Sequence, residues 1–115
     1  MWVFTQTGFV SAVESDKEEG KLNVRARDRQ SLETLADLAN VGIVESPPYR
    51  DYEYRVFVTR EQFAEWMRLN IEFLDYSNFK NRVWDTLGDT YHDACSDVWS
   101  VMLSVSDKRQ PVARR

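Results

Sequence analysis

The order of apolar and polar positions predicts a chain whose first half is rich in strands and whose second half is helical. Residues 2–13 are mostly aromatic or β-branched and show no helical repeat, which favours one long strand. Gly8 lies in its middle, where a glycine indicates a bulge, a bend or the close approach of another backbone. A polar loop leads to a second strand over residues 21–28, in which apolar and polar side chains alternate. Residues 43–45 and 52–58 predict two more strands.

Local signals set the expected ends of the first two helices. Ser31 is placed to cap a helix over residues 31–40, and Gly42 is placed to end it in the left-handed conformation. Thr59 and Gln62 have the spacing of a capping box, and the apolar residues that flank them have the spacing of a hydrophobic staple. A second helix is therefore expected to begin directly after Thr59.

The remaining chain predicts a third helix and completes the architecture. Residues 75–78 indicate a break, with Ser77 or Asn78 capping a last helix that runs to about residue 104. Gly88 either splits that helix or is tolerated within it. The expected order is β-β-α-β-β-α-α. We therefore predict an α+β fold, with a four-stranded antiparallel sheet and all helices packed on one face in two layers.

Composition narrows the class of protein. The 115 residues suit a single domain, which we place at residues 1–105, followed by a flexible basic tail at residues 106–115. A single cysteine excludes an internal disulfide and a thiolate zinc site, and indicates a reducing compartment. No run approaches the ~20 apolar residues of a membrane span, and the first residues lack a signal-peptide pattern. We expect a cytoplasmic protein that is complete from its own start, with no membrane partner.

Three stretches resemble a set of short bacterial and phage proteins. They are the opening stretch at residues 1–13 with its Thr-Gly-Phe, the strand at residues 22–27, and the Asp-Tyr-x-Asn-Phe-Lys stretch at residues 75–80, which is followed by His92 and the late Val98-Trp99. Ser77 stands where a proline is common in that set. The resemblance spans most of residues 1–103. It implies a free-standing small protein and no established activity.

Two neighbouring side chains could carry chemistry. His92 is the only histidine, and Cys95 follows three residues later on the same side of the helix. A nucleophilic pair would need the two groups in hydrogen-bond contact, together with a third group that orients the base and donors for an oxyanion. The sequence supplies neither of these, and Cys95 falls within the apolar stripe of its helix. We therefore expect a buried thiol, no catalytic residues, and no metal or cofactor.

An acidic stripe and an exposed tryptophan are the candidate partner-binding residues. Four aspartates recur every four residues and repel one another mildly, so this unfavourable pattern needs an explanation. A solvated face, a basic partner and a cation are the three alternatives. Trp84 widens the apolar arc of the same helix, and exposed tryptophans are common interface anchors. The candidate partner-binding set is Trp84, Asp85, Asp89, Asp93 and Asp97.

Arginines on the predicted sheet give a second candidate surface. Alternating arginines beside aromatic side chains are typical of single-strand nucleic-acid binders, in which the arginines contact phosphates. Acidic neighbours favour ion pairs on a solvated face as the other interpretation. The candidate nucleic-acid residues are Arg25, Arg27, Arg29 and Arg55, with Lys108, Arg109, Arg114 and Arg115 of the tail.

These features rank the functions that the sequence allows. The leading hypothesis is a non-catalytic protein-interaction or accessory module of a bacterium or phage, whose partner is another protein or a second copy of itself. The alternative is a small nucleic-acid-associated protein that uses the arginines and the tail. The third is an enzyme or metal site around His92.

Overall fold

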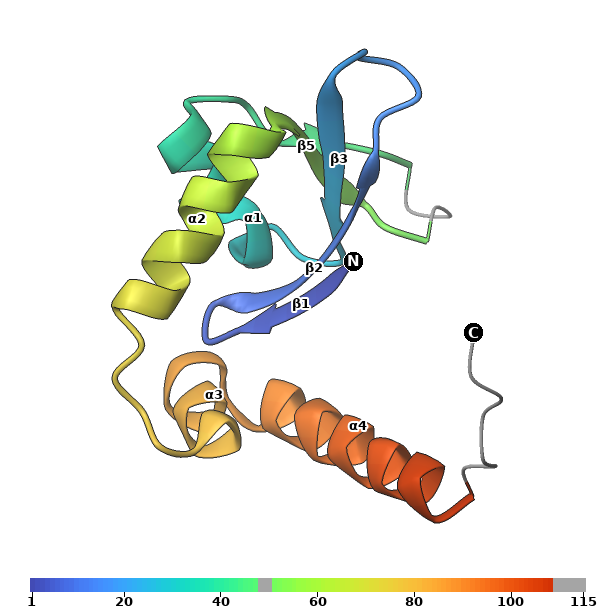
Figure 1. The fold of residues 1–115 in the computed structure, drawn as a ribbon, viewed down its shortest axis with the longest axis vertical. Coiled ribbons are helices and arrows are strands. Elements are labelled where there is room, and N and C mark those ends of the chain that lie inside the picture. Colours follow the sequence, from blue (N-terminus) through green and yellow to red (C-terminus); the bar gives the residue numbers. More distant parts are fainter. Residues whose placement is uncertain (48–50, 109–115) are drawn as a thin grey trace, which may run out of the picture.

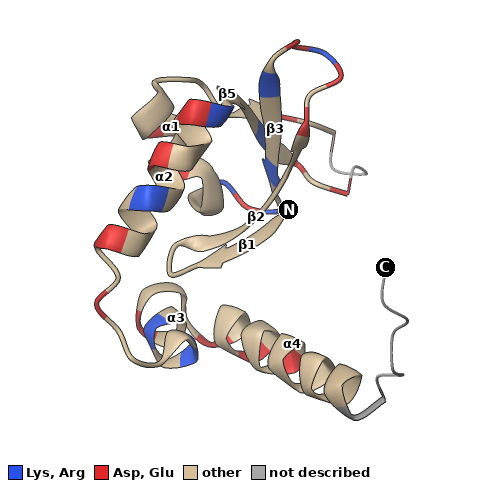
Figure 2. Cartoon of the chain, in the orientation of Figure 1, with Lys and Arg blue, Asp and Glu red and all other residues tan. Residues whose placement is uncertain are grey.

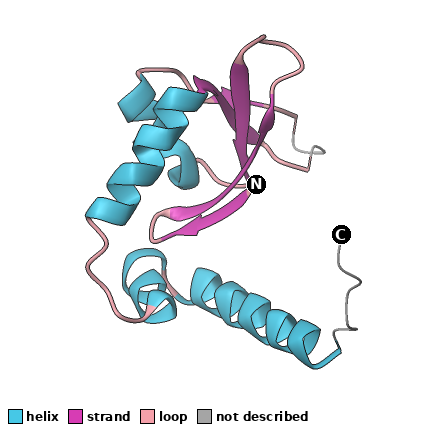
Figure 3. Ribbon diagram, viewed as in Figure 1, coloured by secondary structure: helices cyan, strands magenta, loops and turns pink. Residues whose placement is uncertain are grey.

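The computed structural model describes residues 1–47 and 51–108 and has the predicted α+β class. A five-stranded antiparallel sheet with the strand order β1-β2-β3-β5-β4 carries four helices (Figure 1, Figure 3). The strands are β1 (Trp2–Thr5), β2 (Gly8–Glu14), β3 (Lys21–Ala26), β4 (Val44–Glu45) and β5 (Tyr54–Thr59). The helices are α1 (Gln30–Ala39), α2 (Arg60–Glu72), α3 (Phe79–Leu87) and α4 (Asp89–Lys108).

The predicted first strand is wrong, because residues 2–13 form a hairpin instead of one strand. β1 and β2 pair antiparallel, with Thr5 opposite Gly8, and the chain turns at residues 6–7. The Thr5 hydroxyl accepts a hydrogen bond from the backbone N–H of Thr7 at 3.2 Å, which stabilises the turn. This hairpin raises the strand count from the predicted four to five. The turn residues of this hairpin, Gln6 and Thr7, are not the Asn-Gly or Asp-Gly pair that is typical of a two-residue turn.

One face of the sheet carries the hydrophobic core. Alternate strand residues point to the same face, so Val10, Val24 and Val56 lie together under α1 and α2. Leu32 and Leu35 of α1 are fully buried against them. The rest of the core comes from the same strands and helices: Ala12, Ala26, Ala36, Ala39, Val58, Phe63 and Trp66.

The ends of α1 and α2 test the capping predictions. The capping box of α2 is confirmed: the Thr59 hydroxyl accepts from the Gln62 N–H at 3.1 Å, and the Gln62 amide oxygen accepts from the Thr59 N–H at 2.9 Å. Ser31 does not cap α1, since it lies in the first turn and its N–H donates to Asp28 at 2.9 Å. The left-handed residue that ends α1 is Asn40, with a φ of 53°, rather than Gly42.

Helices lie on both sides of the sheet at the β1–β2 hairpin (Figure 1), whereas the sequence placed all of them on one face. Val3 packs against the core, and its neighbours Trp2 and Phe4 therefore point to the opposite face. Phe4 lines a cavity there with Val98 and Trp99 of α4. Figure 1 shows the β1–β2 hairpin between α1 on one side and α3 and α4 on the other.

Gly88 splits the predicted last helix. Its φ of 89° lies in the region that favours glycine, and α3 ends before it while α4 begins after it. Asn78 caps α3 by accepting a hydrogen bond from the N–H of Asn81 at 3.0 Å. α4 continues to Lys108, so residues 106–108 are helical rather than part of a tail. The rest of the predicted tail, residues 109–115, lies outside the described residues. Within the described residues, no helix is long and apolar enough to cross a membrane.

Candidate functional site

The largest group of exposed apolar side chains lies on the last turns of α4 and on β1. We call these eight residues the apolar surface. Their exposed fractions run from 38% for Phe4 to 72% for Trp2. Isolated exposed apolar residues are ordinary, but a group of this size is a candidate binding surface. The members are Trp2, Phe4, Val98, Trp99, Val101, Met102, Leu103 and Val105.

The sequence of α4 explains why one side of its first half contacts the sheet while its second half is exposed. Tyr91, Cys95 and Val98 recur at helical spacing and face the outer side of β1 and β2. The same spacing continues through Met102 and Val105, which are 57% and 48% exposed, and Figure 1 shows the last turns of α4 extending past the hairpin. The helix therefore extends an apolar stripe beyond the sheet that covers its beginning.

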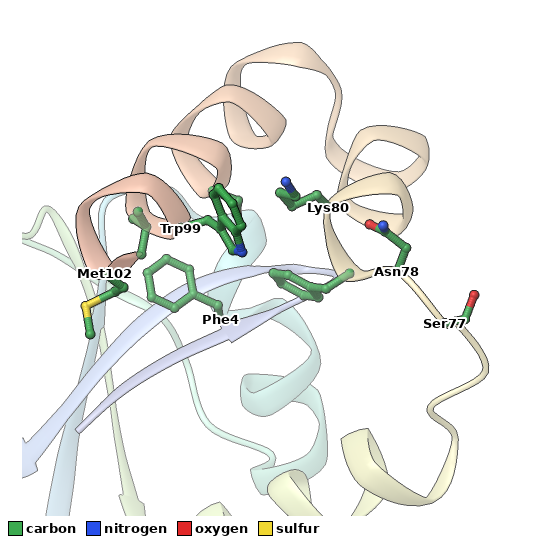
Figure 4. Close-up of a pocket in the computed structure, with 9 residues that line it drawn as sticks. Phe4, Ser77, Asn78, Lys80, Trp99 and Met102 are labelled. Atoms are coloured by element: carbon green, nitrogen blue, oxygen red, sulfur yellow. The ribbon is translucent and has the colours of Figure 1, made fainter. Parts of the chain in front are cut away.

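A cavity of about 510 Å³ lies beneath this exposed half of α4. Figure 4 shows Phe4 of β1 facing Trp99 and Met102 of α4 across it. The Lys80 ammonium lies 5.0 Å from the centre of the Trp99 ring, within cation–π range, and adds one positive charge to the rim. The other lining residues are Ser77, Asn78, Phe79, Cys95 and Val98.

A second cavity of about 380 Å³ lies on the other side of the contact between β1 and α4. Trp2, Phe4 and Phe9 form its aromatic wall, with the Phe4 and Phe9 ring centroids 4.6 Å apart. Phe4, Cys95 and Val98 line both cavities, so the two flank one line of contact. The apolar surface is thus hollowed on both sides, which gives a partner side chain somewhere to insert.

A polar cluster fixes the beginning of α4 against the sheet. The Tyr91 hydroxyl donates a hydrogen bond to Asp28 Oδ2, and the Ser31 hydroxyl donates to Asp28 Oδ1 at 2.7 Å. The two hydroxyl oxygens lie 3.1 Å apart, and Ser31 Oγ also accepts from the N–H of Phe9 at 3.1 Å. Asp28 therefore joins α1 to α4 directly, and Ser31 links the pair to β2.

This cluster predicts a pH dependence. Burial, followed by the hydrogen bond to Asp28, raises the pKa of Tyr91 from 10.0 to about 12. The unfolded chain loses this proton near its ordinary pKa while the folded chain retains it, so the contribution of Tyr91 to stability is complete below pH 10 and is lost as the pH rises toward 12. In an ultraviolet titration of the folded protein, we expect one of the five tyrosines to ionise late. Tyr91→Phe should remove that late step, and its persistence in the variant would contradict the assignment.

The predicted partner-binding residues are divided between two helices. Asp85 belongs to α3, and the break at Gly88 interrupts the stripe before Asp89. Asp89, Asp93 and Asp97 line one exposed side of α4, where Figure 2 shows acidic residues. Within the described residues, no group of three potential metal ligands is found.

Trp84 and His92 contact each other at the junction of α3 and α4. Trp84 is 54% exposed and its ring centroid lies 5.1 Å from that of His92. His92 Nδ1 lies 3.2 Å from Asp93 Oδ1, and no hydrogen bond joins His92 to Cys95 in the part of the chain that the structure describes. Burial raises the pKa of the Cys95 thiol, which disfavours the thiolate. The arrangement lacks the contacts of a nucleophilic pair.

The four candidate arginines already have partners within the described residues. Arg25 donates to the Ser11 hydroxyl at 2.8 Å, and both Arg25 and Arg27 lie 4.6 Å from the Tyr52 ring centre. The remaining contacts are the Arg27–Asp51 pair at 3.9 Å, the Arg29–Glu45 pair at 3.5 Å and the Arg55 bond to the Tyr52 carbonyl at 3.3 Å. These arginines lie on and beside β3 and β5, on a different element from the acidic side of α4 (Figure 2).

Sequence patterns alone do not reveal most of the apolar surface. Val98, Val101 and Met102 have the helical spacing of a core stripe, and that spacing does not show whether the sheet reaches far enough to cover them. One signal was present: residues 98–106 contain no charged side chain in a chain that is 30% charged. Trp99 and Leu103 widen the stripe beyond the width that a single contact buries.

Comparisons with known proteins do not assign this surface. No protein-family model, curated protein or solved structure matches the chain. The resemblance to short bacterial and phage proteins therefore stays a prediction.

Proposed function

We propose that this chain is a non-catalytic protein-binding module and that the apolar surface is its binding site. The observation that carries the proposal is the group of eight apolar side chains on α4 and β1, each 38% exposed or more. At roughly 100 Å² for each half-exposed large side chain, they present on the order of 800 Å² of apolar area. This estimate exceeds the ~300–600 Å² of the largest apolar patch on a typical monomer.

The composition of the surface supports a protein partner. Tryptophan is the residue type most enriched among interface hot spots, and Trp2 and Trp99 are both more than half exposed. Methionine, which adapts its shape to a partner, is represented by Met102. Cavities beside these anchors provide the pockets in which hot-spot side chains of a partner pack.

Substitution of Met102 tests the proposal. Met102 lies at the middle of the apolar arc of α4, and Ser100 lies about 160° away around the helix at ~100° per residue. Met102→Asp places a carboxylate on the surface, where an interface would desolvate it. We expect the variant to retain its protein partner at least about tenfold less than the wild type, which corresponds to a hot-spot loss of ~1.4 kcal/mol or more. Affinity capture of the full chain, with mass spectrometry of the retained proteins, measures the difference.

Ser100→Asp is the matched control, because it adds the same charge to the same helix on its polar side. It should retain the partner as the wild type does, and circular dichroism should show the same helix content in all three proteins. Equal retention by Met102→Asp and the wild type would show that the binding site lies elsewhere. Retained protein that disappears after nuclease treatment would favour the nucleic-acid alternative.

A further inference from the structure

We infer that the partner of the apolar surface is a second copy of this chain, bound about a two-fold axis that passes near Met102, with the two α4 helices antiparallel. This inference rests on the proposed function and names its partner. The axis position follows from the nine uncharged residues 98–106, whose midpoint is residue 102. A two-fold axis requires a surface that is complementary to itself.

The area of the apolar surface is what a stable dimer needs. A standard protein–protein interface buries about 800 Å² on each partner. The eight exposed side chains offer an area of that order, as estimated above from roughly 100 Å² each. A second copy presents the same area, so an isologous contact covers both surfaces and leaves neither exposed.

Antiparallel pairing about Met102 matches apolar residues with apolar residues. Residue 99 lies opposite residue 105 of the second helix, and residue 101 lies opposite residue 103. Each surface also contains a projecting side chain and a cavity that can receive the one from the second copy. Trp99 is 58% exposed, and the cavity of about 510 Å³ lies beside it. Ser100 and Ser104 fall on the side of α4 away from the axis.

The helix dipoles favour the antiparallel direction over the parallel one, because antiparallel dipoles oppose each other. Asp89, Asp93 and Asp97 precede the uncharged segment on the same helix. At ~100° per residue they lie on the same side of α4 as Ser100, which faces away from the axis, so the pairing leaves them in solvent.

Two single-cysteine variants test the geometry. In a Cys95→Ala background, the full chain carries only the introduced thiol. Met102→Cys places that thiol next to the two-fold axis, where two copies of it approach within disulfide range, whereas Ser100→Cys places it on the far side of the helix. We expect mild oxidation to give a covalent dimer of Met102→Cys at least about tenfold faster than of Ser100→Cys. Equal rates for the two variants would overturn the proposed axis.

Light scattering during size-exclusion chromatography gives the second measurement. The chain has a mass of 13.5 kDa, and we expect the wild type to elute at twice this mass and Met102→Asp at the monomer mass. A wild type that stays at 13.5 kDa up to about a millimolar concentration would overturn the second copy as partner. If that monomer still retains another protein through Met102, the proposed function survives and only this inference fails. If it retains no protein, both fail.

Discussion

Replacing Gly8 with alanine is expected to lower the free energy of unfolding by about 3 kcal/mol or more. Gly8 has a φ of 141°, a backbone conformation that side chains disfavour. A Cβ added there would lie 1.9 Å from Ser31 Oγ and 2.9 Å from Ser31 Cα. Since the Cα of Ser31 is backbone, the contact cannot be relieved by rotating a side chain. Either the β1–β2 turn or the first turn of α1 must move.

Alanine substitutions at two other glycines separate the cost of backbone strain from the cost of the contact with Ser31. Gly20 also has a positive φ, 79°, but a Cβ there meets nothing within 4 Å, so Gly20→Ala tests backbone strain alone. Gly42 has neither a positive φ nor a close neighbour, and Gly42→Ala should change stability by less than about 0.5 kcal/mol. Urea unfolding of the three variants gives the order of the losses. A Gly8→Ala loss no larger than that of Gly20→Ala would show that the contact with Ser31 is unimportant.

The position of Gly8 also explains how much of the fold the sequence could predict. A glycine in an aromatic strand correctly indicated a bend or a close approach, but the approaching group is the side chain of Ser31, 23 residues away in sequence. The capping box at Thr59 was predictable because both partners lie within one helical turn. Gly88 was correctly recognised as a position where the last helix could break. The local sequence did not show whether the helix would break there or continue through the glycine.

The candidate site depends on contacts that are distant in sequence, and local patterns do not encode these. Tyr91 donates to Asp28 across 63 residues, and this bond helps to hold α4 on the outer face of the hairpin. Nothing in the spacing of Tyr91 distinguishes it from the apolar positions around it. The sequence therefore predicted the apolar stripe of α4 but not the point at which the sheet ceases to cover it. Stripe residues that the sheet covers belong to the core, and those beyond the edge of the sheet form the apolar surface.

Replacing Asp28 with alanine is expected to cost about 3 kcal/mol of stability and to loosen α4 from the sheet. The carboxylate accepts from the Ser31 N–H, the Ser31 hydroxyl and the Tyr91 hydroxyl. Its removal leaves the Ser31 N–H, in the first turn of α1, without the side-chain acceptor that acts as its cap, and it leaves two partly buried hydroxyls without this acceptor. Urea unfolding measures the loss of stability, and amide hydrogen exchange in the first turns of α4 measures the loosening.

Two milder substitutions separate the loss of stability at α1 from the loosening of α4. Asp28→Asn retains an oxygen that can accept from the N–H of Ser31, so the α1 cap survives and the loss should be near 1 kcal/mol. Tyr91→Phe removes only the bond from α4 to Asp28, and it should speed exchange in α4 without affecting α1. If Asp28→Ala destabilised α1 while exchange in α4 stayed as slow as in the wild type, the polar cluster would be a cap for α1 alone. The direction of α4, and with it the orientation of the apolar surface, would then be set by the contacts of Cys95 and Val98 with Phe4.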